Sequence, residues 1–192
     1  MRHNSLRDCE AKLLREVCRD VKTEPVLIPT VGEMASGNTA DRARADVSAI
    51  GVWSGCERTF VDVMVTHPTG DTNMTKPLDR VYKDCERKKK GEYNQRIIDV
   101  ERGSFTPLIY TTTGGMGPEC SRFNKRVAEL ITAKRKEHYS EVMRHIRTSL
   151  RFALLRSTLV AVRGIRGKDS NGTAKLDDIS YNLVTRLVAY EG

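Results

Sequence analysis

The sequence has no paired cysteines of the kind that bind zinc or form redox motifs. Five cysteines are scattered along the chain, and no two of them make a CxxC pair. This spacing argues against a zinc knuckle or a thioredoxin-like site. An odd number of unpaired thiols is typical of a protein that works in a reducing compartment. The five are Cys9, Cys18, Cys56, Cys85 and Cys120.

Long apolar runs are missing as well. The opening stretch MRHNSLRDCEAKLL has no apolar core of the kind that a secretory signal needs, so we expect no such signal. No run of about 18 apolar residues occurs, which predicts that no segment spans a membrane. The stretch TTTGGMGP lacks the GK[ST] ending of a P-loop. It is either a tight glycine turn or a phosphate contact at a helix start.

Positive charge is what the sequence has in excess. Lys and Arg total 33 against 25 Asp and Glu, which gives the 192-residue chain a formal net charge of +8. Such an excess favours polyanionic partners, with nucleic acid first and an acidic membrane second. A basic surface that only keeps the protein soluble is an equally open interpretation. At 39% hydrophobic residues, the chain is long enough for one domain with its own core.

Hydrophobic spacing predicts alternating helices and strands. We expect helices over residues 5–20, 78–102, 119–137 and 139–164, with a bend or break near Gly91. We expect strands over residues 24–30, 44–53, 58–67 and 105–114, the second and third forming a hairpin and the proline-bounded first lying at an edge. This order predicts an α/β domain in which a small mixed β-sheet is flanked by helices.

A carboxylate stands inside the best predicted strand. Asp62 lies in TFVDVMVTHP, and burying an unpaired carboxylate costs several kcal/mol. Asp46 lies on the preceding predicted strand, and hairpin partners on one face are about 5 Å apart. If the register aligns them, the two acids form a hard oxygen site suited to Mg²⁺. The alternative is that Asp46 pairs with Arg42 or Arg44, and Asp62 with a lysine of the next helix.

Several runs carry a resemblance to a known family. They are RHNSLRDCEAKLLREVC, EPVLIPT, RADVSAIGVW, TFVDVMVTHP, YNQRIIDVERGSFTPLIYTTTGGMGP and IRTSLRFALLRSTLVAVRG. Together they resemble the restriction-enzyme-like endonuclease domain of site-specific non-LTR retrotransposons, part of the PD-(D/E)XK nuclease superfamily. The resemblance covers residues 2–164 and implies a restriction-endonuclease-like core of helix, three strands, helix and strand. Residues 165–192 form a C-terminal tail outside it.

The resemblance implies roles for particular residues. Asp46 and Asp62 would hold Mg²⁺ or Mn²⁺, with Glu10 or Glu16 in support. The family has a lysine two residues after the second acid, where this chain has Met64. The replacement candidates for that lysine are Lys83, Lys88, Lys89, Lys90 and Arg96, of which we take Lys90 as the catalytic residue. The candidate nucleic-acid contacts are Lys88, Lys89, Arg96, Lys125 and Arg126.

These observations lead us to expect a nuclear, metal-dependent endonuclease domain of retroelement origin that nicks target DNA. Its partners would be DNA and a reverse transcriptase or other retroelement segment, and no membrane. The alternative is an inactive nucleic-acid-binding remnant of the same fold, because methionine cannot replace the motif lysine. A partner-binding scaffold is a third class.

Overall fold

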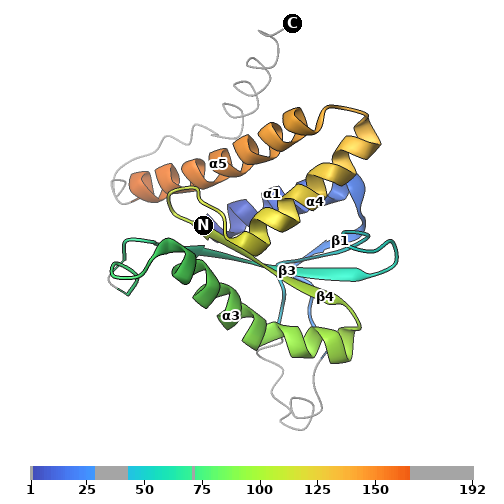
Figure 1. Cartoon of the computed structure of the whole chain (residues 1–192), viewed down its shortest axis with the longest axis horizontal. Helices are drawn as coiled ribbons and strands as arrows, with labels where there is room; N and C mark the ends of the chain where they lie inside the picture. Colours follow the sequence, from blue (N-terminus) through green and yellow to red (C-terminus); the bar gives the residue numbers. More distant parts are fainter. Residues whose placement is uncertain (1, 29–42, 71, 165–192) are drawn as a thin grey trace, which may run out of the picture. The chain divides into compact units, whose positions relative to one another are not determined.

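Four strands form one mixed sheet with helices on both faces in the computed structural model, which describes residues 2–28, 43–70 and 72–164. Helices α1, α4 and α5 cover one face and α3 covers the other (Figure 1). The elements in chain order are α1 (Arg2–Val17), β1 (Arg19–Thr23), β2 (Val47–Ile50), β3 (Arg58–Thr66), α3 (Leu78–Arg96), the π-helical turn η1 (Ile97–Glu101), β4 (Ser104–Thr111), α4 (Pro118–Arg135) and α5 (Tyr139–Gly164). The α/β class, with a mixed sheet flanked by helices, is as predicted.

The sheet has the strand order β1-β2-β3-β4. Strands β1, β2 and β3 are antiparallel neighbours, whereas β3 and β4 are parallel and joined through α3. Strand β4 is an edge strand, which explains how it tolerates Pro107, a residue with no backbone N–H to donate. The predicted hairpin of β2 and β3 is confirmed, with Val47 facing Val61 and Ile50 facing Arg58.

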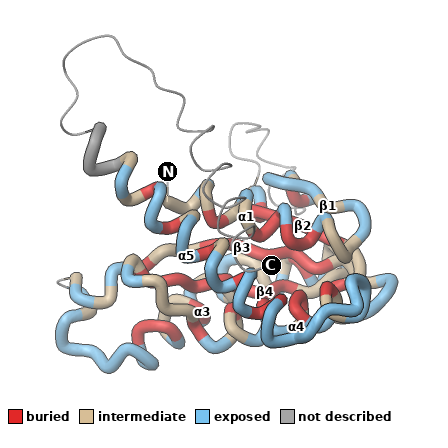
Figure 2. The backbone as a smooth tube through the Cα atoms, turned by 90° about the horizontal axis from the view of Figure 1, so that it is seen from above, coloured by how far each residue is buried: buried red, intermediate tan, exposed pale blue. Residues whose placement is uncertain are grey.

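Side chains of strand β3 alternate between two hydrophobic cores. Val61 and Val63 pack with α1, α4 and α5, whereas Phe60 packs with Ile97 and Phe105 on the α3 side. Buried residues, drawn in red, therefore concentrate in the central strands and on the helix faces that meet them (Figure 2). Asp62, between the two valines, faces α3 because successive strand residues point to opposite faces.

The first strand differs from the prediction. We expected helix to about residue 20 and a strand over 24–30, but helix α1 ends at Val17 and the strand is Arg19–Thr23. Of the predicted strand, the described part forms only an isolated antiparallel bridge between Val26 and Arg44, and residues 29–30 lie outside the described residues. Positive φ angles at Asp20 and Glu24, 45° and 52°, set the irregular path of strand β1, and the ladder shifts register between Arg19 and Lys22. Polar strands of this kind have too little hydrophobic alternation for sequence patterns to find.

The break expected near Gly91 does not occur. Helix α3 runs through Gly91 without interruption, and the irregularity comes later, in the π-helical turn that begins at Ile97. Arg102, with φ 54°, then ends the helical segment in the left-handed conformation.

The glycine-rich stretch after β4 is a structural turn. Gly114 has φ +90°. The Gly115 N–H donates to Thr111 Oγ1 at 2.8 Å, and the Gly117 N–H donates to the Ile109 carbonyl at 2.8 Å. The Glu119 N–H donates to the carboxylate of Glu86 on α3 at 3.0 Å. These donors are used within the protein, which favours the turn over the phosphate-binding interpretation.

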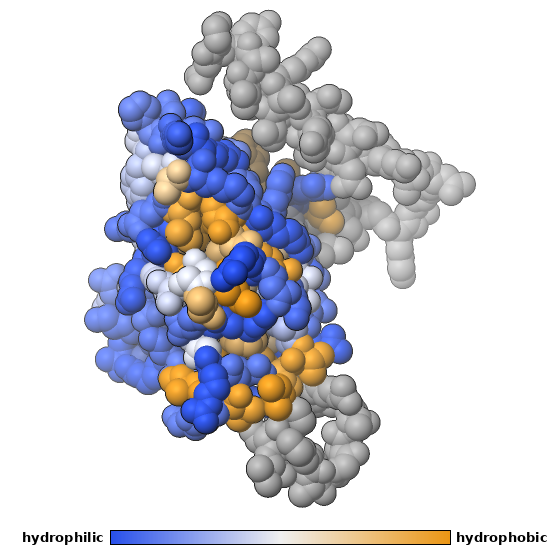
Figure 3. Space-filling view, turned by 90° about the vertical axis from the view of Figure 1, so that its right-hand side faces the viewer, coloured by the Kyte–Doolittle hydropathy of each residue, from blue (hydrophilic) through white to orange (hydrophobic). Residues whose placement is uncertain are grey.

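Hydrophilic residues cover most of the face shown in Figure 3, with apolar patches between them. Isolated exposed apolar residues are normal in folded proteins. Among the described residues, no helix is long and apolar enough to cross a membrane. By its contacts the chain divides into two compact units, Met1–Val160 and Ala161–Gly192. All residues of the sites described below lie in the first unit. The predicted tail, 165–192, lies outside the described residues.

Candidate active site beside strand β3

Asp62 forms an ion pair with Lys89 of helix α3. The Nζ of Lys89 lies 2.9 Å from Oδ2 of Asp62, and the Asp62 side chain is only 7% exposed. Lys89 also lies 3.3 Å from a carboxylate oxygen of Glu92 and 5.4 Å from the ring centroid of Tyr93. Burial works to lower the pKa of Lys89, but its close ion pair with Asp62 raises it above its ordinary value. Lys89 therefore stays protonated at neutral pH.

Asp46 occupies the place where β2 stops pairing with β3. Its backbone N–H donates to the carbonyl of Val61, although Val61 already faces Val47 in the ladder. The regular register, which would set Asp46 opposite Asp62, is therefore broken at this point. Instead the Asp46 side chain reaches β3, and its Oδ2 accepts the backbone N–H of Val63 at 2.6 Å.

His3 of α1 is the second partner of Asp46. Its Nε2 lies 2.8 Å from Asp46 Oδ2, and its Nδ1 lies 3.2 Å from the side-chain oxygen of Asn4. Oxygen atoms beside both ring nitrogens favour the imidazolium form, which donates from both. The hydrogen bond to Asp46 accordingly raises the pKa of His3, while partial burial opposes it. Of the two predicted partners, Arg44 instead lies 3.8 Å from Glu24, and Arg42 lies outside the described residues.

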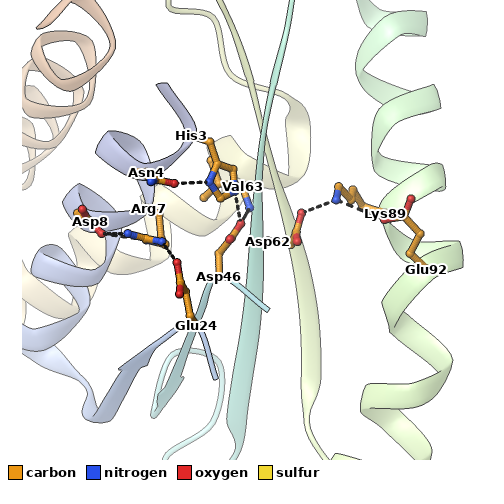
Figure 4. Close-up of polar contacts among 10 residues, drawn as sticks. All are labelled: His3, Asn4, Arg7, Asp8, Glu24, Asp46, Asp62, Val63, Lys89 and Glu92. Atoms are coloured by element: carbon orange, nitrogen blue, oxygen red, sulfur yellow. Dashed lines mark hydrogen bonds and ion pairs between the residues drawn. The ribbon is translucent and has the colours of Figure 1, made fainter. Parts of the chain in front are cut away.

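The two acids lie beside the same part of strand β3 but have different protein partners. Figure 4 shows Asp46 next to His3 on the α1 side of β3, and Asp62 directed toward Lys89 on α3. Burial raises the pKa of Asp62, and the negative charge of Asp46 raises it further, against the attraction of Lys89. The carboxylates are therefore close enough to interact electrically. That they share one metal ion stays a prediction.

A cavity of about 550 Å³ opens beside His3 and Lys89, the partners of the two acids, and neither Asp46 nor Asp62 is among its lining residues. Positive side chains line much of it, and Met64, in place of the motif lysine, lines it too. Its lining consists of Arg2, His3, Val63, Met64, Val65, His67, Lys88, Lys89 and Thr112. A cavity with this charge fits an anionic group such as a phosphate.

Two lysines flank the buried face of α3, and their partners show which of them reaches the acid. Tyr82, Glu86, Lys89, Tyr93 and Ile97 follow one another at steps of three and four residues, which places them on one helix face. Lys90, four residues after Glu86, lies on the opposite edge of the same face and binds Glu119 of α4 at 2.7 Å. The lysine beside Asp62 is therefore Lys89, which we expected to contact nucleic acid, and not Lys90. Helical periodicity alone does not distinguish Lys89 from Lys90, because both lie three or four residues from Glu86 and from Tyr93.

The two glutamates predicted to support the metal lie elsewhere. Glu10 is fully buried and accepts hydrogen bonds from the Tyr110 hydroxyl and, at 3.2 Å, from Asn124. Burial raises the pKa of Glu10 to about 7, against the effect of these two donors. Glu16 pairs with Arg135 of α4 at 2.5 Å. Neither contacts Asp46 or Asp62.

The other predicted nucleic-acid contacts are distributed over three places. Lys88 lines the cavity beside Asp62. Arg96 donates to the carbonyl of Ile28 at 2.8 Å. Lys125 and Arg126 lie on α4, where they line a second cavity. Only Lys88 and Lys89 are thus brought to the candidate active site.

The two acids offer oxygen ligands that fit Mg²⁺. Oδ2 of Asp62 is buried and accepts no hydrogen bond of normal geometry from the described residues, although Lys89 is close. Both hydrogen-bond partners of the Asp46 side chain, the His3 ring and the backbone N–H of Val63, contact its Oδ2. Mg²⁺ needs only one or two carboxylates, with waters and substrate phosphate as its remaining ligands. No group of three or more His, Cys, Asp or Glu side chains placed for a metal occurs within the described part.

Comparison with protein-family models and with curated proteins gives no match.

Proposed function

We propose that the protein is a metal-dependent DNA endonuclease domain of retroelement origin. In this proposal Asp46 and Asp62 bind Mg²⁺, and Lys89 takes the role of the motif lysine, whose position in the sequence Met64 occupies. The observation that carries the proposal is the ion pair of Lys89 with Asp62, 2.9 Å long and beside Asp46 and a cation-lined cavity. A buried acid pair with a perturbed carboxyl pKa next to a cavity is typical of a catalytic site.

The element order supports the restriction-endonuclease-like core. Helix α1, strands β1 to β3, helix α3 and strand β4 follow one another as the resemblance implies. Asp46 at the start of β2 and Asp62 within β3 correspond to its two acidic positions. The nuclear location, and a reverse transcriptase as partner, belong to the same proposal and depend on the resemblance alone.

Each residue of the site has a separate part in phosphodiester hydrolysis. Bound Mg²⁺ would supply charge for the phosphate and acidify the attacking water. The ammonium of Lys89 orients that water and offsets negative charge as it forms on the phosphate, and does not accept its proton, because Lys89 stays protonated. His3 holds Asp46 in place. Water attacks phosphorus in line and loses a proton to solvent, the bond to the 3′ oxygen breaks, and that oxygen takes a proton from solvent, so the products are a 3′-hydroxyl and a 5′-phosphate.

A plasmid-nicking assay tests the proposal. Wild-type protein should convert supercoiled plasmid to the open circle in Mg²⁺ but not in EDTA. Lys89→Met should lower the rate by about 100-fold, the size of effect seen when one transition-state donor is lost. The matched control is Lys90→Met, which removes a neighbouring lysine bound to Glu119 and should leave the rate unchanged.

Two further variants make this test sharper. Nicking that survives Asp62→Ala belongs to a contaminant or another site and contradicts the proposal. Met64→Lys in the Lys89→Met background should restore part of the rate, because Met64 lines the same cavity. If Lys90→Met is as harmful as Lys89→Met, the assignment of Lys89 is wrong.

A specific observation also favours the second candidate, an inactive nucleic-acid-binding remnant. Each acid already has a protein cation, His3 for Asp46 and Lys89 for Asp62. Such pairing can neutralise the site without a metal. The remnant would bind DNA with a steep salt dependence, cut nothing in Mg²⁺ or Mn²⁺, and bind equally well after Asp62→Ala.

A further inference from the structure

A second cavity, of about 520 Å³, lies on helix α4 beside the turn between β2 and β3. It is separate in its residues from the cavity beside Asp62. Its lining consists of Trp53, Pro118, Ser121, Arg122, Lys125, Arg126 and Glu129. The concave surface thus brings together one aromatic ring, three cations and one carboxylate.

Trp53 is held in a fixed orientation. Its indole N–H donates to Thr106 Oγ1 at 3.3 Å, and its ring meets Phe123 edge-on with centroids 6.2 Å apart. The guanidinium of Arg122 lies over the indole, 4.9 Å from the ring centroid. Trp53 and Arg122 therefore form a cation–π pair, which we call the Trp53–Arg122 platform. Its ring system is only partly buried.

The cations around the platform are not neutralised equally. Arg126 donates to the carbonyl of Val52 at 2.9 Å and to Glu129 at 3.1 Å, so it is held in place and paired. Across the described ranges, no carboxylate lies within ion-pair distance of Arg122 or Lys125. The cavity therefore has an excess of positive charge and two cations free to bind an anion.

We propose that this cavity binds an unpaired nucleotide of single-stranded nucleic acid. The base stacks on the Trp53–Arg122 platform, and Lys125 binds the adjoining phosphate. Stacking on a flat platform with a nearby cation is how proteins bind single strands without reading sequence. An acidic peptide would match the charge but leave the platform without a flat partner. The proposal goes beyond cleavage and holds whether or not the acids at β3 cut DNA.

Trp53 is the only tryptophan of the chain, so its fluorescence reports on this cavity directly. The full-length protein is titrated with a short oligothymidylate in EDTA, where metal-dependent cleavage cannot occur. We expect saturable quenching, and binding about 10-fold weaker for an abasic strand of equal length, because only the base stacks. The Asp62→Ala variant should give the same curve as wild type, which separates this site from the proposed nuclease site.

Three variants locate the binding. Lys125→Gln should weaken binding and lower the slope of log affinity against log salt by about 0.7, the value for one phosphate contact on a single strand. Arg122→Gln should reduce the difference between the thymidylate and abasic strands. The matched control is Lys12→Gln, an exposed lysine of α1 that does not line the cavity, and it should change neither quantity.

Three results would overturn the proposal. Quenching could be absent, or equal for abasic and thymidylate strands. Lys125→Gln could behave like Lys12→Gln. An acidic peptide could quench Trp53 as strongly as the oligonucleotide, which would assign the cavity to a protein partner. If quenching follows the expectation while plasmid is never nicked, the nucleotide site stands and the endonuclease proposal fails.

Discussion

Four carboxylates are buried among the described residues, and three of them, Asp62, Asp46 and Glu10, differ in how they are held. Asp62 has a lysine, and Asp46 has a histidine and a backbone N–H. Glu10 has only neutral donors, the Tyr110 hydroxyl and the Asn124 amide. Because a neutral donor offsets less of the cost of burying a charge than a cation does, Glu10 is the carboxylate whose ionisation the fold resists most.

Glu10→Gln should therefore stabilise the protein at alkaline pH. Burial raises the folded pKa of Glu10 from 4.5 to about 7. Between these values the folded state keeps a proton that the unfolded chain releases, so the free energy of unfolding falls as pH rises. Above pH 7 the loss reaches about 3 kcal/mol. Urea unfolding at pH 4 and pH 8 should show Glu10→Gln close to wild type at the lower pH and more stable at the higher.

A matched variant checks that the effect comes from burial. Glu16→Gln removes a carboxylate from the same helix, but one that pairs with Arg135 near the surface. The free energy of unfolding of Glu16→Gln should therefore change with pH in the same way as that of wild type. A Glu10→Gln variant that loses stability equally at both values of pH would show that Glu10 is ionised and well stabilised in the fold.

The titration of His3 should report the contact with Asp46. The pKa of His3 is raised chiefly by its hydrogen bond to Asp46, and less by that to Asn4. Its stabilising contribution is thus fully present below the ordinary value of 6.5 and is lost as pH rises through the folded pKa. Because His3 is half exposed, we expect less than about 1 kcal/mol.

NMR titration of the His3 ring protons measures this contact. Asp46→Asn should lower the pKa of His3 more than Asn4→Ala does. Equal shifts in the two variants would mean that the orientation of His3 toward Asp46 is wrong.

At the scale of elements, periodicity predicts much of the fold. Helices α4 and α5 and strands β3 and β4 carry long apolar patterns, and their predicted limits differ from the observed ones by no more than a few residues. The sequence pattern did not predict strand β1, because pairing with β2 stabilises this strand and its own residues show little hydrophobic alternation. Burial of one helix face also decides that α3 continues through Gly91, a position where local propensity favours a break.

Gly91→Ala should stabilise the protein. Gly91 lies inside α3, and nothing is within 4 Å of the position that an added Cβ would occupy. Alanine loses less backbone entropy than glycine in a helix, so the free energy of unfolding should rise by about 0.5–1 kcal/mol. Urea unfolding measures the change. If α3 were broken at Gly91, alanine would have no such effect.

Gly103→Ala is the opposite case and serves as the control. A Cβ at Gly103 would come 2.4 Å from the backbone oxygen of Arg58, at the start of the parallel pairing between β3 and β4. Backbone atoms cannot move aside as a side chain can, so this variant should be less stable than wild type. The two substitutions add the same methyl group, and only their surroundings decide the sign.

At the scale of the molecule, the sequence predicted the residues of the site better than their contacts. Asp46 and Asp62 were identified because acids are rare inside apolar strands. Pairing of Asp62 with a helix lysine was one of the predicted alternatives, but Lys89 was only one of several candidates. The contact of His3 with Asp46 was not predicted, since both contacts depend on how α1 and α3 lie against the sheet. Hairpin register alone also suggested that the two acids face each other, which the break of the ladder at Asp46 prevents.

The net charge of +8 is spread over the chain, but the cation-lined cavity beside Asp62 should contribute a definite share of DNA binding. Lys88 lines this cavity and forms no ion pair with any described residue, whereas Lys90 is bound to Glu119. Lys88→Gln should therefore lower the slope of log affinity against log salt for duplex DNA by about 1, and Lys90→Gln should leave it unchanged. Fluorescence anisotropy at several salt concentrations in EDTA measures both slopes. Equal slopes for the two variants would mean that duplex DNA binds elsewhere on the basic surface. The cavity beside Asp62 would then not be the place where the cut strand binds.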